Sequence, residues 1–169
     1  MLFQEIVGKI GMLRDVPVFY WEDLICATVT YLKPTTKKER GVYLPDCEIG
    51  VFYENAKNNN PIEFSHMKSI IESICEFNEY TYALFNVLHE LGHWVHYTQF
   101  RAHGYSDYEY IDKFEIDRIK LYAQREEEAK AFRGNTVEEF NNKYSKLYCE
   151  LPTEKEADNY AATHLVDFL

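Results

Sequence analysis

The residues with the clearest chemical potential lie in the segment His89-Glu90-Leu91-Gly92-His93, which has the pattern H-E-x-x-H. Residues four positions apart lie on one face of an α-helix, so His89 and His93 can present two imidazoles to one metal ion. Glu90 lies one position further round, where its carboxylate can take a proton from a water molecule at the metal. The segment therefore predicts a metal centre with two histidine ligands and a carboxylate base.

The surrounding sequence predicts the helix that such a site requires. Between about Tyr80 and Phe100, an apolar side backs the histidine face and consists of Leu84, Val87, Leu88, Leu91, Trp94 and Val95. Gly92 is less favourable than alanine inside a helix by about 1 kcal/mol. We therefore expect another element to approach this helix closely at Gly92.

A third ligand is expected downstream, because a catalytic zinc ion keeps three protein ligands and one open position. Glu154 and Asp158 are four residues apart, on one face of a predicted helix whose small residues would allow close packing: Ala157, Ala161 and Ala162. We favour Glu154 as the metal ligand. Asp158 would then accept a hydrogen bond from the free ring N–H of a ligating histidine.

Other acids compete for the role of third ligand. One of the consecutive residues Glu126, Glu127 and Glu128 is an alternative, since this run also precedes small residues. Glu156 and Glu150 are further alternatives. Glu156 has a competing role, because a helix that starts at Thr153 would use it in a capping box.

The two segments resemble the gluzincin class of zinc peptidases, and within it the ImmA/IrrE-like small metallopeptidases. Those proteins typically have an apolar helix with HELGH and a later E-x-x-A-[ND]-x-[FY]-A segment, which corresponds here to EKEADNYA, residues 154–161. The resemblance implies Zn²⁺ held by His89, His93 and Glu154, with Glu90 as the general base. HELGHW followed by a run of glutamates is also similar to the peptidase-like domain of ArdC-type antirestriction proteins.

The same resemblance implies two further features of a peptidase site. One is an N-terminal sheet whose edge strand binds an extended substrate, for which GVYLP (41–45) or EIGVFY (48–53) is suited. The other is a histidine or tyrosine that stabilises the oxyanion. His96 falls near the ligand face, but we expect it to pack on Tyr97 or Trp94. We expect Tyr160 to pack in the core, and the remaining histidines to lie at the surface or at helix ends: His66, His103 and His164.

Composition limits the classes of partner. The chain has 169 residues with 18 basic and 28 acidic side chains, a formal net charge of −10. Such a chain lacks the basic surface that grips a phosphate backbone or an anionic membrane. It has neither a leader-like N-terminus nor the run of about 18 apolar residues that crosses a bilayer. We expect a cytoplasmic protein without nucleic acid or membrane partners, whose widely spaced cysteines are reduced thiols: Cys26, Cys47, Cys75 and Cys149.

The elements that would position the site fall into two parts. In a sheet-rich part, about residues 14–55, four β-branched and aromatic runs predict short, mostly antiparallel strands: 16–21, 27–32, 41–45 and 48–53. AKNNNP at 56–61 predicts a loop. A helical part, about residues 64–169, begins with a helix capped by Ser65. It includes three later helix starts with a Ser/Thr-x-x-Glu signature, at Ser106, Thr136 and Thr153.

We therefore expect one α+β domain over residues 1–169, with a small, mostly antiparallel N-terminal sheet and a mainly helical zincin-like body. The predicted function is zinc-dependent hydrolysis of a peptide bond in a dedicated protein substrate, with Glu90 as general base. The alternative is a zincin-fold binding or antirestriction-type factor whose acidic surface carries the function.

Overall fold

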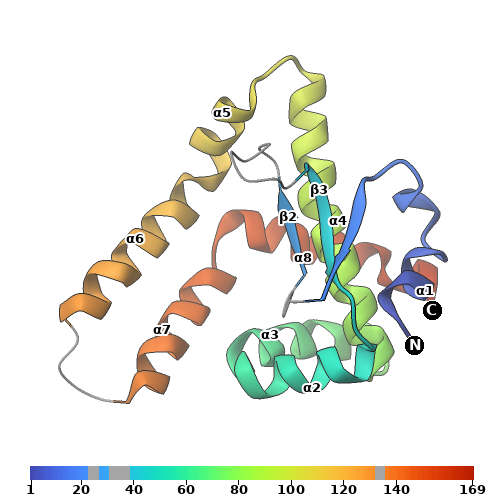
Figure 1. Ribbon diagram of the computed structural model, residues 1–169, viewed down its shortest axis with the longest axis horizontal. Coiled ribbons are helices and arrows are strands. Elements are labelled where there is room, and N and C mark those ends of the chain that lie inside the picture. Colours follow the sequence, from blue (N-terminus) through green and yellow to red (C-terminus); the bar gives the residue numbers. More distant parts are fainter. Residues whose placement is uncertain (23–26, 31–38, 132–135) are drawn as a thin grey trace.

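The computed structural model describes residues 1–22, 27–30, 39–131 and 136–169 (Figure 1). Its central element is the long helix α4 (Glu79–Ala102), which contains the whole H-E-x-x-H segment. The segment that contains Glu154 and Asp158 lies on α8 (Pro152–His164), which packs more extensively against α4 than any other described element does. The chain combines a small sheet with a mainly helical body, so the α+β class is confirmed.

The sheet has three strands in the order β1-β3-β2: β1 (Val18–Trp21), β3 (Gly41–Pro45) and β2 (Thr28–Thr30). β1 runs parallel to β3, with Val18 opposite Val42, whereas β2 runs antiparallel to β3. The expectation of a mostly antiparallel sheet is therefore wrong. The strands were expected to run mostly antiparallel, but β1 pairs in parallel with β3, which is not the next strand in the sequence.

β3 is the central strand, and all five of its residues are buried. Its sequence, GVYLP, lacks apolar–polar alternation, as is typical of a strand covered on both faces. Since β3 pairs on both sides, residues 41–45 do not offer the free edge that was expected to bind a substrate. In the described sheet, that edge belongs to β1 or β2.

The prediction of a fourth strand at residues 48–53 is also wrong, because this segment begins α2 (Ile49–Asn59). The apolar residues Ile49, Phe52 and Ala56 are buried, and their spacing fits one face of a helix. A short apolar run does not distinguish strand from helix by periodicity alone. The predicted loop at 56–61 is likewise absent: α2 continues to Asn59, and α3 (Pro61–Glu72) begins two residues later with proline in its first turn.

The remaining helices are α1 (Phe3–Val7), the 3₁₀ helix η1 (Gly11–Leu13), α5 (Asp107–Tyr110), the π-helix η2 (Ile111–Glu115), α6 (Ile116–Ala131), α7 (Val137–Cys149) and the 3₁₀ helix η3 (Leu165–Phe168). The predicted caps are confirmed at Ser106 and Thr136, whose hydroxyls accept from the Glu109 and Glu139 backbone N–H groups. The predicted caps at Ser65 and Thr153 are wrong. Ser65 lies one turn inside α3, which begins at Pro61, and Thr153 lies one residue inside α8, which begins at Pro152.

The core surrounds the N-terminal half of α4, where every residue from Thr81 to His93 is buried. Part of this core consists of aromatic rings that contact one another: Phe52, Tyr53, Phe64, Phe77 and Tyr82. By contrast, α6 has no buried residue, and with α7 it forms an arm that extends from one side of the molecule (Figure 1). Among the described helices, none combines the length and apolar character needed to cross a bilayer.

Cys149 is buried, and Cys47 and Cys75 are half-buried, all three as free thiols. This agrees with the expectation of reduced cysteines, while Cys26 lies outside the described residues. The predicted strand residues Tyr31 and Leu32 also lie outside them.

Candidate metal centre

His89, His93 and Glu154 meet at one point between α4 and α8. The Nε2 atoms of His89 and His93 are 3.2 Å apart, and Glu154 Oε2 lies 3.3 Å from the first and 3.5 Å from the second. All three side chains are buried. Three atoms that carry lone pairs repel one another at this spacing unless a proton or a cation lies between them. This buried group could therefore hold a metal ion.

Close packing of the two helices makes this convergence possible. A Cβ atom placed on Gly92 would lie 2.9 Å from Tyr160 Cβ and 3.2 Å from the Ala157 backbone. Glycine on α4 and alanine on α8 therefore allow the helix axes to approach directly behind the histidines, as the sequence predicted. Because α8 starts at Pro152, Glu154 lies in its first turn, with its carboxylate directed at the face of α4 that carries the histidines.

Asp158 connects two histidines on different helices. Its Oδ1 lies 2.9 Å from His89 Nδ1, and its Oδ2 lies 2.7 Å from His66 Nε2. The first contact is the hydrogen bond expected from the spacing of Glu154 and Asp158. It fixes the His89 ring so that Nε2 points toward His93 and Glu154. The contact with His66 was missed, because His66 lies on α3, 92 residues earlier, and no local pattern marks it.

The electrostatics of the group reflect dense packing of acids against histidines. Burial opposes the charge on His89, but the hydrogen bonds that its ring donates to Asp158 and Glu154 outweigh burial and set the pKa of His89 well above its ordinary value. Burial would likewise raise the pKa of Glu154, yet the hydrogen bonds with His89 and His93 lower it strongly. The pKa of Asp158 is lowered against its burial by hydrogen bonds with His66 and His89. Both carboxylates are therefore held as anions, which is the form that binds a cation.

Glu90 lines a cavity of about 210 Å³ beside these residues. The cavity is also lined by His89, Glu154 and Asp158 and by side chains of α2, α3, α6 and α7. Burial raises the pKa of Glu90, which brings this carboxyl closer to the range in which a side chain exchanges protons near neutral pH. A group that could move a proton thus faces the same space as His89 and Glu154.

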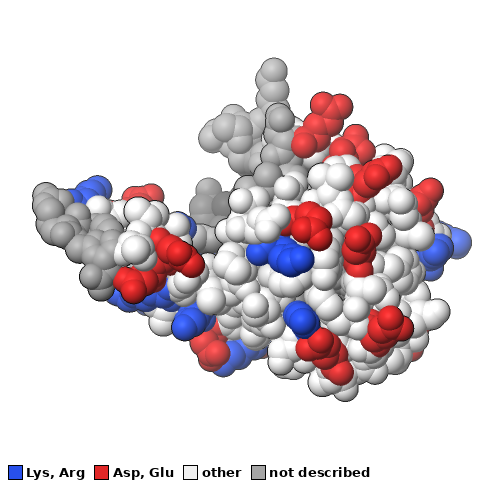
Figure 2. Space-filling view, turned by 90° about the horizontal axis from the view of Figure 1, so that it is seen from below, with Lys and Arg blue, Asp and Glu red and all other residues white. Residues whose placement is uncertain are grey.

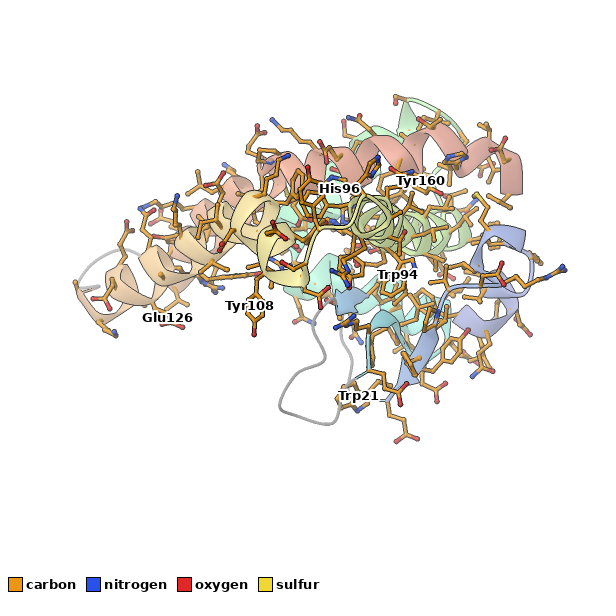
Figure 3. The ribbon with its side chains drawn as sticks, turned by 90° about the horizontal axis from the view of Figure 1, so that it is seen from above. Trp21, Trp94, His96, Tyr108, Glu126 and Tyr160 are labelled. Carbon is orange, nitrogen blue, oxygen red and sulfur yellow. The ribbon has the colours of Figure 1, made fainter. Side chains whose placement is uncertain are left out.

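The competing acids lie elsewhere. Glu126 projects from the outer part of α6, far from the α4 residue His96 (Figure 3). The others point to solvent and pair with lysines or approach another histidine: Glu127 with Lys130, Glu128 with Lys143, Glu150 with Lys155, and Glu156 with His96 at 3.6 Å. Of the candidate acids, the described structure brings only Glu154 to His89 and His93.

The other predicted placements are partly correct. His96 packs on Phe114 and Tyr110, with ring centroids 4.4 and 5.5 Å away, rather than on Trp94 or Tyr97. Tyr160 packs against the core beside Gly92, as expected. His103 bonds to the Gln99 carbonyl near the end of α4, and His164 pairs with Asp167, as expected for residues at helix ends.

Three further polar residues near the centre were not anticipated. Asn86 and Tyr148 line the cavity. Glu115, at the end of the π-helix, is buried and pairs with Arg118. Asn86 had a usable signal, since it interrupts an apolar run one helical turn before Glu90. No signal in the sequence marked Glu115 or Tyr148, because tertiary packing brings these two residues to the site.

Comparisons with protein-family models, with curated proteins and with solved structures find no match for this chain.

Proposed function

We propose that the protein is a zinc-dependent metallopeptidase with a zincin-like body, and that His89, His93 and Glu154 bind the zinc ion. The observation that carries the proposal is the spacing of the three ligand atoms, 3.2, 3.3 and 3.5 Å. A tetrahedral zinc ion with bonds of about 2.0–2.2 Å to nitrogen and oxygen separates its ligand atoms by about 3.3–3.6 Å. The donor set of two histidines and one glutamate also matches a catalytic site that keeps a fourth position open.

When bound, zinc supplies a Lewis acid that acidifies a water molecule and polarises a carbonyl group. Glu90 accepts the proton of the attacking water through its carboxylate and delivers it to the leaving amine. Burial supports this role because the raised pKa of Glu90 lets it both take and release a proton. Asp158 holds His89 in the tautomer that leaves Nε2 free for the metal.

Tyr148 is the candidate for stabilising the oxyanion. Its side chain lines the cavity with Glu90 and Glu154. Burial and the nearby carboxylates of Glu154 and Glu90 hold the pKa of Tyr148 well above its ordinary value. The phenol therefore stays protonated at neutral pH, as a hydrogen-bond donor must.

The alternative is a binding factor that acts through an acidic surface, and the net charge of −10 is compatible with it. On the face shown in Figure 2, lysines and arginines lie among the acidic side chains, and acidic side chains prevail in the upper right part of the view. A nucleic-acid mimic needs a continuous acidic surface. The spacing of the three candidate ligand atoms is the more specific observation, and the peptidase is therefore the function that we propose.

The test is a metal and activity analysis of the wild type and two variants. We expect about one equivalent of zinc in the wild type, full zinc binding without hydrolysis in Glu90→Gln, and loss of both in His93→Ala. Zinc content is measured by atomic emission. Hydrolysis is measured by mass spectrometry of a proteome digested with the zinc-loaded protein.

Glu156→Gln is the matched control for Glu90→Gln, because it makes the same change at an exposed position. Zinc below about half an equivalent in wild-type protein, or unchanged hydrolysis by Glu90→Gln, would contradict the proposal.

A further inference from the structure

One end of the cavity contains a polar group that the proposed chemistry does not use. Asn86 is only 7% exposed and lies on α4, three residues before His89 and four before Glu90, on the same face. Its amide nitrogen donates to the Tyr82 carbonyl oxygen at 2.8 Å. Because that partner accepts only, the nitrogen must face it, and the carboxamide oxygen faces away. Among the described residues, nothing donates to this oxygen.

The walls around Asn86 are apolar and tightly held. Tyr82, which accepts the hydrogen bond from Asn86, and Phe52, which stacks on Tyr82, line the cavity together with Ala56 and Met67. Phe52 and Tyr82 stack at 5.6 Å, and Tyr82 also contacts Phe64 at 5.0 Å, so these walls belong to the aromatic part of the core. A mostly apolar pocket with one well-placed polar group is the usual form of a site that both binds and orients a ligand.

Asn86 is also at a suitable distance from the metal centre. Four residues of α-helix separate it from Glu90, a rise of about 6 Å. An extended peptide advances about 3.3 Å per residue. A peptide with its scissile carbonyl at the metal centre would therefore bring a main-chain N–H, one or two residues away, to the level of the Asn86 oxygen.

The charge of the cavity lining limits which substrate side chains can bind beside that main-chain N–H. The cavity lining includes four carboxyl groups, on Glu63, Glu90, Glu154 and Asp158, which repel an acidic side chain. Phe52, Ala56 and Tyr82, which line the same cavity as Asn86, are each buried and offer apolar contact. Burying an apolar side chain there is favourable, because it removes apolar surface from water. Burying a charged side chain there is unfavourable, because the charge loses its hydration.

We propose that Asn86, Phe52, Ala56 and Tyr82 form a subsite for an apolar residue of a peptide substrate, bound next to the scissile bond. The Asn86 carboxamide oxygen accepts the main-chain N–H of the bound peptide, and the apolar side chain fills the space against Ala56. This inference rests on the proposed function, since the metal centre fixes the position of the scissile carbonyl.

The test measures binding of hydroxamates to the zinc-loaded protein by isothermal titration calorimetry. Acetohydroxamate reports the metal alone, and the Nα-acetyl hydroxamates of leucine, glutamate and lysine report the subsite. We expect the leucine compound to bind at least tenfold more tightly than acetohydroxamate, because a buried leucine side chain is stabilised to that extent or more. The glutamate and lysine compounds should gain little.

Two variants separate the apolar walls from the hydrogen bond. Ala56→Leu should remove the preference for the leucine compound and leave acetohydroxamate binding unchanged, whereas Ala123→Leu, on the exposed side of α6, should change neither. An Nα-methylated leucine compound lacks the N–H, so the wild type should bind it several-fold more weakly. Asn86→Leu should bind the methylated and unmethylated compounds equally.

The outcomes distinguish the two proposals. If acetohydroxamate binds but the leucine, glutamate and lysine compounds bind with equal affinity, the subsite is overturned and the proposed function stands. Tighter binding of the lysine compound, or discrimination by N-methylation that survives in Asn86→Leu, also overturns the subsite. If zinc-loaded protein does not bind acetohydroxamate, the peptidase centre and the subsite fail together.

Discussion

The α-carbon of Gly92 faces Tyr160 so closely that a Cβ on residue 92 would lie 2.9 Å from Tyr160 Cβ. This relationship sets the distance between α4 and α8, and therefore between the histidines and Glu154. The contact involves the first side-chain atom of Tyr160 and the Ala157 backbone, so rotation of a flexible side-chain end cannot relieve it.

We predict that Gly92→Ala destabilises the protein by about 1–3 kcal/mol, the usual cost of overpacking a core. Alanine has the better helix propensity, by about 1 kcal/mol, so a loss of stability would show that helix packing dominates. Urea unfolding of the metal-free protein measures the effect. Gly11→Ala is the control, because a Cβ there meets nothing within 4 Å and should change stability by less than about 0.5 kcal/mol. Equal stability of Gly92→Ala and wild type would contradict the close packing.

The second prediction concerns the choice of Glu154 over the neighbouring acids. Glu154→Gln should weaken zinc binding by more than about 100-fold, since it removes a charged ligand rather than a hydrogen-bonded partner of one. Glu156→Gln makes the same change two residues away on an exposed side chain, and should leave zinc affinity within about twofold. Competition with a chromogenic chelator measures both affinities. A larger loss in Glu156→Gln than in Glu154→Gln would reassign the ligand.

The third prediction concerns Asp158, which orients His89 through Nδ1. Asp158→Asn should weaken zinc affinity by about 10–100-fold, the range typical of a lost hydrogen-bond partner behind a metal ligand. Asp167→Asn is the matched control, because it changes another aspartate that pairs with a histidine, His164, at an exposed position. The same chelator competition applies. Unchanged zinc affinity in Asp158→Asn would mean that His89 needs no such support.

The parts of this site that the sequence predicted are those with a local period. His89, Glu90 and His93 lie on one helix, and Glu154 and Asp158 lie on another, so spacing alone placed each set on one face. The packing of α4 against α8 was predictable from Gly92 and the alanines, because small residues have few other purposes at such a position.

The parts that the sequence did not predict depend on contacts between distant segments. His66 on α3 contacts Asp158, and β1 pairs with β3 although β2 lies between them in the sequence. Neither contact leaves a local pattern in the sequence. Residues 48–53 misled for a different reason, since β-branched and aromatic residues fit a strand as well as a buried helix start. Tertiary packing against α4 decided between the two.

The last prediction is that stability depends on pH with opposite sign in the metal-free and zinc-loaded protein. In the metal-free protein, hydrogen bonds with Asp158 and Glu154 raise the pKa of His89 against its burial, and a hydrogen bond with Asp158 raises the pKa of His66. A histidine with a raised pKa in the folded state contributes stability that is complete below its unfolded pKa of about 6.5. That contribution is lost as the pH rises through the folded pKa. His96 has the opposite sign, since burial lowers its pKa, but it is half-exposed and should contribute less.

We therefore expect the free energy of unfolding in EDTA to fall between about pH 6 and pH 8. In Asp158→Asn, which lacks the carboxylate shared by His89 and His66, the fall should be smaller. With saturating zinc the trend should reverse, because metal binding requires deprotonated imidazoles and so strengthens as the pH rises. Urea unfolding at several pH values, with and without zinc, measures both slopes. Parallel slopes in the two states would show that the histidines titrating in the metal-free protein are not those that bind the metal.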